Sequence, residues 1–405
     1  MAVSITEALD MIYQNTSPVS SELLPVELTL GRIVAQECIA QFDLPRFDNS
    51  AMDGYAIKCA DAGSTVHCQE IIYAGDRGDM ILEKGKAIKI MTGAPIPKGC
   101  EAIVPVENVT VVNDRVTLPG GIKLHTNIRK AGEDIKSGTC YLCKGQKVTA
   151  YAIAMLASQG VTHISVYRKI RVAVFGTGDE LKPHFEKIAP HQLYNSNTPM
   201  FLARSQELGC EVRYIGNSSD TMESLETLIR SALDADIILT SGGVSMGDRD
   251  FTKEAFSNLG MQAYFTQIDI KPGKPTTYGK IGKCAIVNLP GNPLASMVNY
   301  ELFVRPLIAK MSGANDYYHG TIRTHIAQDF QIRGNKYTVK LGKFDGTAFD
   351  PITKQLPGMI SPLFHANAFM VTLPSLSTLS KGEEVKIIPI TSNMGRTQQE
   401  DFFTV

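Results

Sequence analysis

The residues best suited to chemistry lie in four glycine-containing turns between residues 176 and 293. Two of these turns are Gly176-Thr-Gly-Asp-Glu180 and Ser241-Gly-Gly-Val-Ser-Met-Gly-Asp-Arg-Asp250. Their glycines let backbone N–H groups approach an anion closely, and their carboxylates can bind a hydroxyl group or a cation. Asp248 and Asp250 suit Mg²⁺ beside a phosphate, because Mg²⁺ favours one or two carboxylates together with ligand oxygens. The ordinary alternatives are a tight turn with a solvated acid and, for Asp250, a helix cap.

The other two turns offer positive charge and the start of a helix. Lys271-Pro-Gly-Lys-Pro275 places two ammonium groups three residues apart on a turn stiffened by proline, which suits a dianion or a polyphosphate. Pro290-Gly-Asn-Pro293 precedes a helical segment, whose first N–H groups favour anions. A solvated loop and simple helix initiation are the alternatives for these two turns.

Each of the four turns follows a segment with the pattern of a buried strand. These segments are 169–175, 236–240, 269–270 and 285–289, and helix-period segments lie between them. Strands that alternate with helices predict a parallel, doubly wound α/β sheet covered on both faces, over residues 169–315. Because ligands of such sheets bind beyond the carboxyl ends of the strands, we expect the four turns to meet in a polar pocket.

Three further parts are predicted around the α/β domain. Residues 1–44 and 137–168 are expected to form one discontinuous N-terminal domain, whose first helix opens with a capping box at Ser4. Residues 45–136 contain short β segments separated by glycine-rich turns, which is typical of an inserted β module. Short alternating strands over 316–405 predict a small C-terminal β domain.

Composition restricts the class of protein. The chain has 405 residues, a net charge of −1, 43% hydrophobic residues and 20% charged residues, as expected of a multidomain globular protein. Nucleic acid is not the expected partner, because no overall positive charge is present. No apolar run approaches the length of a membrane span, and the first residues do not resemble a signal peptide. We therefore expect a cytoplasmic protein without a membrane partner, in which six scattered cysteines are reduced thiols. The remaining two form one Cys-x-x-Cys pair, Cys140 and Cys143, which has no second pair or paired histidines to complete a zinc site.

Four carboxylates of the β module have two interpretations that their spacing does not separate. Asp48, Asp53, Glu133 and Asp134 can coordinate a metal or orient a water molecule. They can equally hold turns through hydrogen bonds to nearby backbone N–H groups.

At these motifs the sequence resembles the molybdopterin molybdenumtransferases of the MoeA family, which are related to the gephyrin E domain. The matching stretches occur in the family's order and span most of residues 1–312. They are Phe47-Asp-Asn-Ser-Ala-Met-Asp-Gly-Tyr-Ala56, Met91-Thr-Gly-Ala-Pro-Ile-Pro97, Arg129-Lys-Ala-Gly-Glu-Asp-Ile135, Gly176-Thr-Gly-Asp-Glu-Leu181, Ser241 to Asp250, Lys271 to Pro275 and Leu289-Pro-Gly-Asn-Pro293.

The resemblance implies four domains, including a MogA-like α/β domain and a barrel-like C-terminal domain. It also implies an elongated homodimer whose active site lies between the α/β domain of one subunit and the β module of the other. The implied reaction inserts molybdate into adenylylated molybdopterin with Mg²⁺ as cofactor and releases AMP. Contact with the molybdopterin adenylyltransferase is a further implied partnership.

The resemblance also assigns roles to individual residues. Catalytic roles fall to Asp53, Thr92, Asp134 and Glu180, and metal binding to Asp53, Glu180 and Asp250. The adenylylated pterin is assigned to Gly178, Asp179, Asp220, Ser241, Gly242, Gly243, Asp250, Pro290, Gly291 and Asn292. Molybdate is assigned to Lys271, Lys274, Lys336 and Ser361.

The C-terminal domain departs from the family pattern. The family usually has an arginine and a Gly-Ser pair there, and the nearest counterparts in this chain are Lys336 and Ser361. A lysine keeps the positive charge but loses the two-pronged guanidinium fork, which leaves the preference between molybdate and tungstate open.

Two rival functions remain: adenylyl transfer to molybdopterin, which does not need the β module, and a non-catalytic molybdopterin-binding or scaffold protein. The non-catalytic function is disfavoured because all four acids are present: Asp53, Asp134, Glu180 and Asp250.

Overall fold

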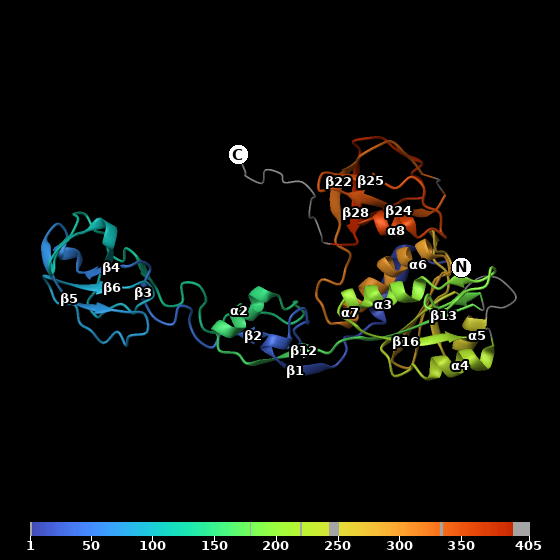
Figure 1. Ribbon diagram of the computed structural model, residues 1–405, viewed down its shortest axis with the longest axis horizontal. Helices are drawn as coiled ribbons and strands as arrows, with labels where there is room; N and C mark the ends of the chain where they lie inside the picture. The colour runs from blue at the N-terminus through green and yellow to red at the C-terminus, as the bar shows by residue number, and fades with distance from the viewer. Residues whose placement is uncertain (1, 179, 219–220, 243–250, 333–334, 392–405) are drawn as a thin grey trace. The chain divides into compact units, whose positions relative to one another are not determined.

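The computed structural model describes residues 2–178, 180–218, 221–242, 251–332 and 335–391, which are drawn as ribbons in Figure 1. The chain divides into two compact units. The main unit comprises residues 1–35, 145–149 and 165–405, and the second unit comprises residues 36–144 and 150–164. This division runs through the predicted discontinuous N-terminal domain, whose residues belong to both units. The finer division into four domains stays a prediction.

A six-stranded sheet forms the centre of the main unit. Its strand order is β16 (Glu211–Ser218), β13 (Arg171–Thr177), β17 (Ile237–Ser241), β21 (Cys284–Leu289), β20 (Thr277–Ile281) and β18 (Gln262–Phe265). The first four strands are parallel, as predicted for the strands that begin near residues 169, 236 and 285. However, β20 is antiparallel to both of its neighbours, so the sheet is mixed.

The predicted strand at 269–270 is not part of this sheet. β19 (Ile270–Lys271) instead pairs with β24 (Tyr337–Phe344) of the C-terminal domain. Proline lacks the N–H group that a ladder needs, so Pro272 and Pro275 stop the chain from continuing as a central strand there. The chain leaves the central sheet after β18 and returns to it as β20.

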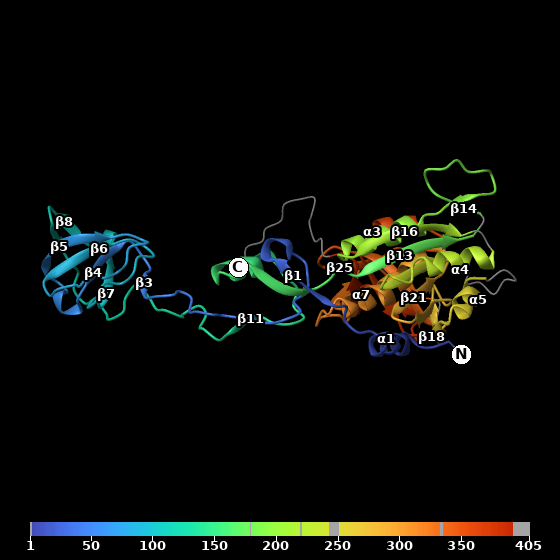
Figure 2. The same ribbon diagram turned by 90° about the horizontal axis from the view of Figure 1, so that it is seen from below.

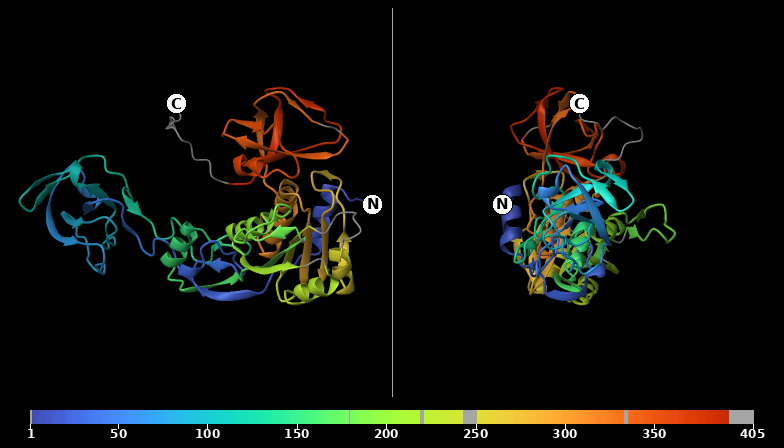
Figure 3. Two further views of the ribbon diagram at one scale, coloured as in Figure 1. Left: turned by 45° about the vertical axis from the view of Figure 1, so that its right-hand side comes forward. Right: turned by 90° about the vertical axis from the view of Figure 1, so that its left-hand side faces the viewer.

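Helices cover both faces of the central sheet, as Figures 1 and 3 show. On one face, α3 (Asn197–Glu207), α6 (Pro293–Asn299), α7 (Arg305–Met311) and α1 (Ile5–Gln14) pack around Val174 and Leu239. On the other face, α4 (Met222–Arg230) and α5 (Phe251–Asn258) pack around Phe175 and Ile238. The alternation of side chains along β13 and β17 therefore supplies two separate cores. Among the described residues, no helix is long and apolar enough to cross a bilayer.

The C-terminal domain is a small closed β structure. β24, β25 (Ala348–Pro351), β22 (Ile322–Ile326), β28 (Glu384–Pro389) and β26 (Ala368–Thr372) pair in that order, and β26 pairs back onto β24. This closure removes the free edges of the five strands. The short helix α8 (Ser361–His365) lies between β25 and β26 in the chain.

Smaller elements complete the main unit. β1 (Ser21–Pro25) pairs with β12 (His163–Tyr167), and β14 (Leu181–Lys182) pairs with β15 (Leu193–Tyr194). The segment that joins β14 to β15 loops away from the central sheet, as Figure 2 shows.

The second unit is built around an all-β sheet, as the glycine-rich turns of 45–136 predict. Its strand order is β7 (Ala102–Pro105), β4 (Gly54–Ile57), β6 (Lys86–Ile90), β5 (Thr65–Ile72), β9 (Arg115–Thr117) and β8 (Thr110–Val112). Short pairs of β2 (Cys38–Ile39) with β11 (Cys140–Leu142) and β3 (Asn49–Ser50) with β10 (Ile128–Arg129) accompany it, together with α2 (Ala150–Ser158). All eight cysteines of the chain are free thiols.

The ends of the central parallel strands lie in register and close together. Gly176 of β13 pairs with Ser241 of β17, which pairs with Leu289 of β21. Directly after this row, Gly242 adopts a φ of +97°, and a Cβ atom added there would lie 2.9 Å from the Thr177 carbonyl oxygen. Glycine is therefore required at 242 both for its backbone conformation and for the close approach of the two strand ends.

A buried carboxylate joins the helices on one face. The Glu301 side chain is 1% exposed, and its oxygens accept hydrogen bonds from Arg204 Nε at 2.7 Å and pair with Arg305 Nη1 at 2.9 Å. Burial lowers the pKa of Arg204, but the Glu301 and Glu207 carboxylates more than offset this and leave that pKa raised. The Glu301 cluster thus ties α3 to the segment that precedes α7.

Removal of the Glu301 carboxylate should destabilise the main unit. Glu301→Ala leaves two largely buried guanidinium groups without their partner, and we expect a loss of about 3–5 kcal/mol. Glu207→Ala is the matched control, because Glu207 contacts the same Arg204 at 2.7 Å but is 65% exposed. The control should cost at most about 1 kcal/mol. Urea unfolding followed by circular dichroism measures both, and equal midpoints for the two variants would contradict this account of the cluster.

A second stability prediction concerns the close approach at Gly242. Gly242→Ala should cost about 2–3 kcal/mol, since it adds a steric clash to the strain of a left-handed backbone. Gly260→Ala is the control: its φ is +80°, but nothing lies within 4 Å of the added Cβ atom. The control should cost only about 1 kcal/mol. Thermal unfolding compares the two variants, and a control as unstable as Gly242→Ala would show that the contact with Thr177 is unimportant.

Candidate active site

Two adjoining cavities lie where the strands of the central sheet end. The larger, the turn cavity, has a volume of about 770 Å³. Described residues from all four predicted turns reach its wall, together with the segment that leads into α3 and two residues near α8. The lining residues are Thr177, Gly178, Glu180, Leu181, Leu193, Tyr194, Asn195, Ser196, Asn197, Gly242, Pro275, Pro290, Gly291, Asn292, Pro293, Gly358 and Ile360.

Glu180 supplies a carboxylate to this wall. Gly178 adopts a φ of +126°, and a Cβ atom added there would lie 2.7 Å from Glu180 Oε2. The exposed carboxylate therefore folds back over the glycine, where a larger residue would displace it. This placement matches the turn predicted after β13, in which glycine permits close approach and the acid is available to a cation or a hydroxyl group.

A buried amide that the sequence analysis missed joins the turns from beneath. Asn197 Nδ2 donates to Ser241 Oγ at 2.6 Å and to the Gly291 carbonyl oxygen at 2.8 Å. Ser241 Oγ in turn donates to the Pro290 carbonyl oxygen at 3.2 Å. The predicted ligand residue Ser241 is thus engaged in holding two turns together. Asparagine at a helix start normally indicates a cap, so this role could not be predicted from the local sequence.

The same asparagine has an unused acceptor. Asn197 is 6% exposed, and its buried Oδ1 atom has no hydrogen-bond partner among the residues that the structure describes. A buried polar atom without a partner is costly, and Asn197 lines the turn cavity. The pairing of this oxygen therefore requires a donor that the described residues do not supply.

The second cavity, the lysine cavity, has a volume of about 470 Å³. It is lined by Lys271, Lys274 and Lys336, and it shares Pro275, Pro290 and Asn292 with the wall of the turn cavity. Within the described parts of the chain these three lysines form no ion pair. An anion in the lysine cavity would therefore meet fixed positive charge directly beside the turn cavity.

Strand pairing between the domains brings these lysines together. Ile270 and Lys271 of β19 pair in parallel with Tyr337 and Thr338 of β24, so Lys336 lies beside the start of β19. Gly273, with a φ of +104°, packs against the Asn299 amide. Ser361 is exposed at the first position of α8 and lines neither cavity, whereas Pro357, Gly358 and Ile360 do.

The remaining predicted acids belong to the second unit. Asp53 Oδ1 accepts hydrogen bonds from the Thr92 backbone N–H and hydroxyl group, both at 2.7 Å. The backbone bond is the main cause of the lowered pKa of Asp53, so this carboxylate stays ionised at neutral pH. Asp134 is exposed, and within the described residues its carboxylate makes no hydrogen bond.

Two other acids of the second unit hold turns. Asp48 pairs with Lys130 Nζ at 2.7 Å and accepts from the Ala131 N–H at 2.9 Å, and the bond from Lys130 lowers the pKa of Asp48. Glu133 Oε2 accepts from the Lys130 N–H at 2.9 Å. For these two residues the structure favours the turn-holding interpretation.

Some predicted ligands lie outside the described residues. These are Asp179, Asp220, Gly243 and Asp250, together with Asp248 of the same turn. Across the described ranges, no three His, Cys, Asp or Glu side chains are grouped to hold a metal. Mg²⁺ does not need such a group, because it usually keeps several waters and binds one or two carboxylates plus substrate phosphates. The exposed Glu180 carboxylate fits that donor set.

Comparison with known proteins gives a consistent result. Residues 3–160 match the family model of the MoeA N-terminal region, domains I and II, and residues 173–310 match that of a probable molybdopterin binding domain. A structure of the molybdopterin biosynthesis protein moeA from Pyrococcus horikoshii superimposes with a TM-score of 0.85 at 26% identity, covering 96% of this chain and 100% of that one.

Curated relatives cover almost the whole chain. The molybdopterin molybdenumtransferase of Haemophilus influenzae is 34% identical over 95% of this chain and 98% of its own length. The enzyme of the same name from Staphylococcus epidermidis is 31% identical over 96% of both chains. With relatives of this similarity over nearly its full length, the chain belongs to the MoeA family of molybdopterin molybdenumtransferases.

Proposed function

We propose that this enzyme inserts molybdate into adenylylated molybdopterin and releases AMP. The observation that carries the proposal is the direct junction of the turn cavity and the lysine cavity, which share Pro275, Pro290 and Asn292. A large cavity lined by glycine turns, with the Glu180 carboxylate in its wall to hold a cation, suits an extended pterin nucleotide. The adjoining cationic cavity suits a small oxyanion. The reaction requires these two substrates to lie side by side.

The turn cavity would bind the adenylylated pterin. Its volume of about 770 Å³ lies within the usual range for ligand sites. Gly178 and Gly291 have no side chain that would keep a phosphate group away from their backbone N–H groups. Gly242, whose own N–H donates to the Leu289 carbonyl oxygen, likewise places no side chain in the cavity. The unpartnered Asn197 Oδ1 atom would accept a hydrogen bond from an N–H group of the ligand.

The lysine cavity would bind molybdate. Molybdate is a tetrahedral dianion, and Lys271, Lys274 and Lys336 supply ammonium groups from two turns that strand pairing holds together. Lysine acts as a point charge and so selects for charge more than for shape. We therefore expect this cavity to accept both molybdate and tungstate.

The phosphoric anhydride of the substrate adds negative charge beside the bound oxyanion. Mg²⁺, when bound, offsets that charge during anhydride cleavage. Glu180 would hold the ion from the wall of the turn cavity. Asp250 is its proposed second ligand, although it lies outside the described residues.

We further propose that the enzyme is a homodimer in which the partner subunit completes each site. Asp53, Thr92 and Asp134 would come from the second unit of the partner. The ionised Asp53 carboxylate, fixed by two bonds from Thr92, is suited to orient a water molecule or to share the cation. Cytoplasmic location and contact with the adenylyltransferase that makes the substrate remain part of the proposal.

The first test follows AMP release from adenylylated molybdopterin in the presence of Mg²⁺ and varied molybdate. Lys271→Ala and Lys274→Ala should each raise the KM for molybdate by about tenfold or more, because each removes one charged contact. Lys283→Ala, an exposed lysine in the turn between β20 and β21, is the control and should leave the KM unchanged. If the KM for molybdate is unchanged in both Lys271→Ala and Lys274→Ala, the oxyanion binds elsewhere.

The second test examines the shared site. Glu180→Ala and Asp53→Ala should each abolish AMP release, but co-expression of the two variants should restore activity. About half of the dimers would contain one copy of each variant. In such a mixed dimer, one of the two sites combines the intact Glu180 of one subunit with the intact Asp53 of the other, so the total activity should be about a quarter of the wild-type value. Differently tagged copies allow the mixed dimers to be isolated. Inactive mixed dimers would refute the cross-subunit site, and full activity of Asp53→Ala would remove Asp53 from it.

A further inference from the structure

The main unit contains a third cavity that the proposed reaction does not use. It has a volume of about 410 Å³ and lies beside Lys169 and Ile170, just before β13, so it is at the opposite end of that strand from the turn cavity. It shares no lining residue with the turn cavity or the lysine cavity. We call it the basic cavity, after the Arg32, Lys147, Arg168, Lys169 and Arg305 side chains in its wall.

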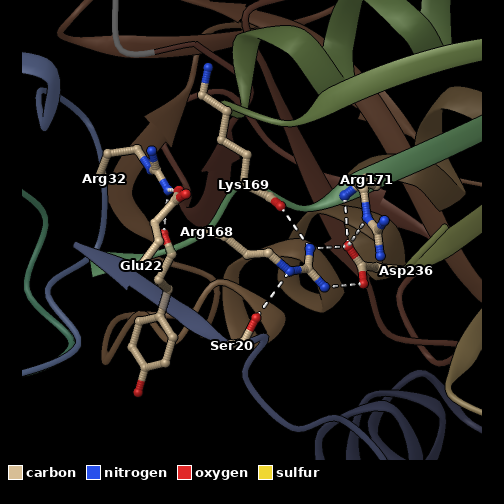
Figure 4. A network of polar contacts seen from close by, with 8 residues as sticks. Ser20, Glu22, Arg32, Arg168, Lys169, Arg171 and Asp236 are labelled. Carbon is tan, nitrogen blue, oxygen red and sulfur yellow. Dashed lines mark hydrogen bonds and ion pairs between the residues drawn. The ribbon is translucent and has the colours of Figure 1, made fainter. Parts of the chain in front are cut away.

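The Arg168 guanidinium of this wall is rigidly held. It forms a two-pronged pair with Asp236, with Nη1–Oδ2 and Nη2–Oδ1 distances of 2.6 and 2.7 Å. Its Nη1 also donates to the Lys169 carbonyl oxygen at 2.9 Å, and its Nε donates to Ser20 Oγ at 3.3 Å. Figure 4 shows this network, with the Lys169 side chain directed away from the Arg168–Asp236 pair.

The other two arginines are anchored in the same manner. Arg32 donates to the Tyr167 carbonyl oxygen at 2.7 Å and pairs with Glu22. Arg305 donates to the Pro389 carbonyl oxygen at 2.8 Å and pairs with Glu301. The Arg32 and Arg305 side chains are only 11% and 19% exposed. Donors held in this way lose little conformational entropy when a ligand binds.

The excess positive charge comes from two lysines. Each of the three arginines already faces a carboxylate, so those pairs contribute little net charge. Lys147 and Lys169 are exposed and form no ion pair within the described part of the chain. Asp316 is the acid in the described wall, and it is also exposed. The wall therefore favours an anion.

The remainder of the wall is apolar and aromatic. Ile170, Cys210 and Ile308 are buried and form part of the apolar lining. Tyr317 and Tyr318 lie in the wall with their ring centroids 4.3 Å apart. Flat rings beside cationic groups bind an aromatic ring through its face while the cations hold an attached anionic group.

We propose that the basic cavity binds a small aromatic anion, in which one ring carries a phosphate group. The volume of about 410 Å³ is within the range of small-molecule sites and suits a ring with one such group. The phosphate contacts Lys147 and Lys169, and the ring lies against the tyrosines and the apolar lining. This site is independent of the proposed transferase reaction.

The test uses phenyl phosphate as the probe and the full chain as the protein. Isothermal titration calorimetry measures its Kd, with inorganic phosphate and phenol as probes of the charge and of the ring alone. We expect phenyl phosphate to bind at least tenfold more tightly than either fragment. Equal affinity for inorganic phosphate would overturn the aromatic part of the proposal, and absence of phenyl phosphate binding would overturn it entirely.

Variants locate the binding. Lys147→Gln together with Lys169→Gln should weaken phenyl phosphate binding at least tenfold, and both residues are exposed, so the fold should tolerate the change. Lys354→Gln, an exposed lysine of the C-terminal domain, is the matched control. Lys271→Gln together with Lys274→Gln should leave the affinity unchanged. If the Lys271 and Lys274 double variant loses phenyl phosphate binding, the probe binds in the lysine cavity and the proposal is overturned. Unchanged binding in the Lys147 and Lys169 double variant would also overturn it.

Discussion

The candidate site depends on one buried amide that holds the ends of parallel strands together. Asn197 Nδ2 donates to Ser241 Oγ at the end of β17 and to the Gly291 carbonyl oxygen after β21, so the first turn of α3 holds two turns of the cavity in place. Hydrogen bonds between buried groups are strong only when the geometry is fixed, and here the in-register strand ends fix it. The glycines around this amide allow two backbone segments to approach each other closely, and they leave room for a bound ligand to approach the backbone.

A second constraint comes from the way the lysine turn is shared between two domains. Lys271 lies in the chain between β18 and β20 of the central sheet, but its own strand, β19, pairs with β24 of the C-terminal sheet. The positions of Lys271 and Lys336 therefore depend on the same ladder. Any substitution that disturbs this pairing would alter the charge arrangement in the lysine cavity without touching a lysine. This coupling gives the C-terminal domain a direct part in oxyanion binding under the proposed function.

Buried charge organises the opposite end of the central sheet. Asp236 lies just before β17 and accepts hydrogen bonds from the Arg168 side chain and from the Arg171 N–H. Burial raises the pKa of Asp236, but these bonds and the two arginine charges more than offset it and leave that pKa lowered. Glu301 joins Arg204 to Arg305 in a similar manner. Because each pair satisfies the hydrogen-bonding groups it buries, the guanidinium groups can line a cavity without destabilising the sheet around them. The basic cavity is a consequence of this arrangement.

The local sequence determined much of this protein by itself. Apolar runs ending in glycine turns predicted β13, β17 and β21, and the alternation of short strands with glycine-rich turns predicted the all-β second unit, because strand and turn preferences act over a few residues. The motifs of the turns also sufficed to indicate the family.

The tertiary structure decided what depends on contacts between distant segments. It assigned residues 270–271 to the C-terminal sheet, made the central sheet mixed, and committed Asp48 and Glu133 to holding turns. It also brought Asn197 beneath two turns that follow it by more than 40 residues. No local pattern encodes such contacts, since they arise only when packing sets which segments meet.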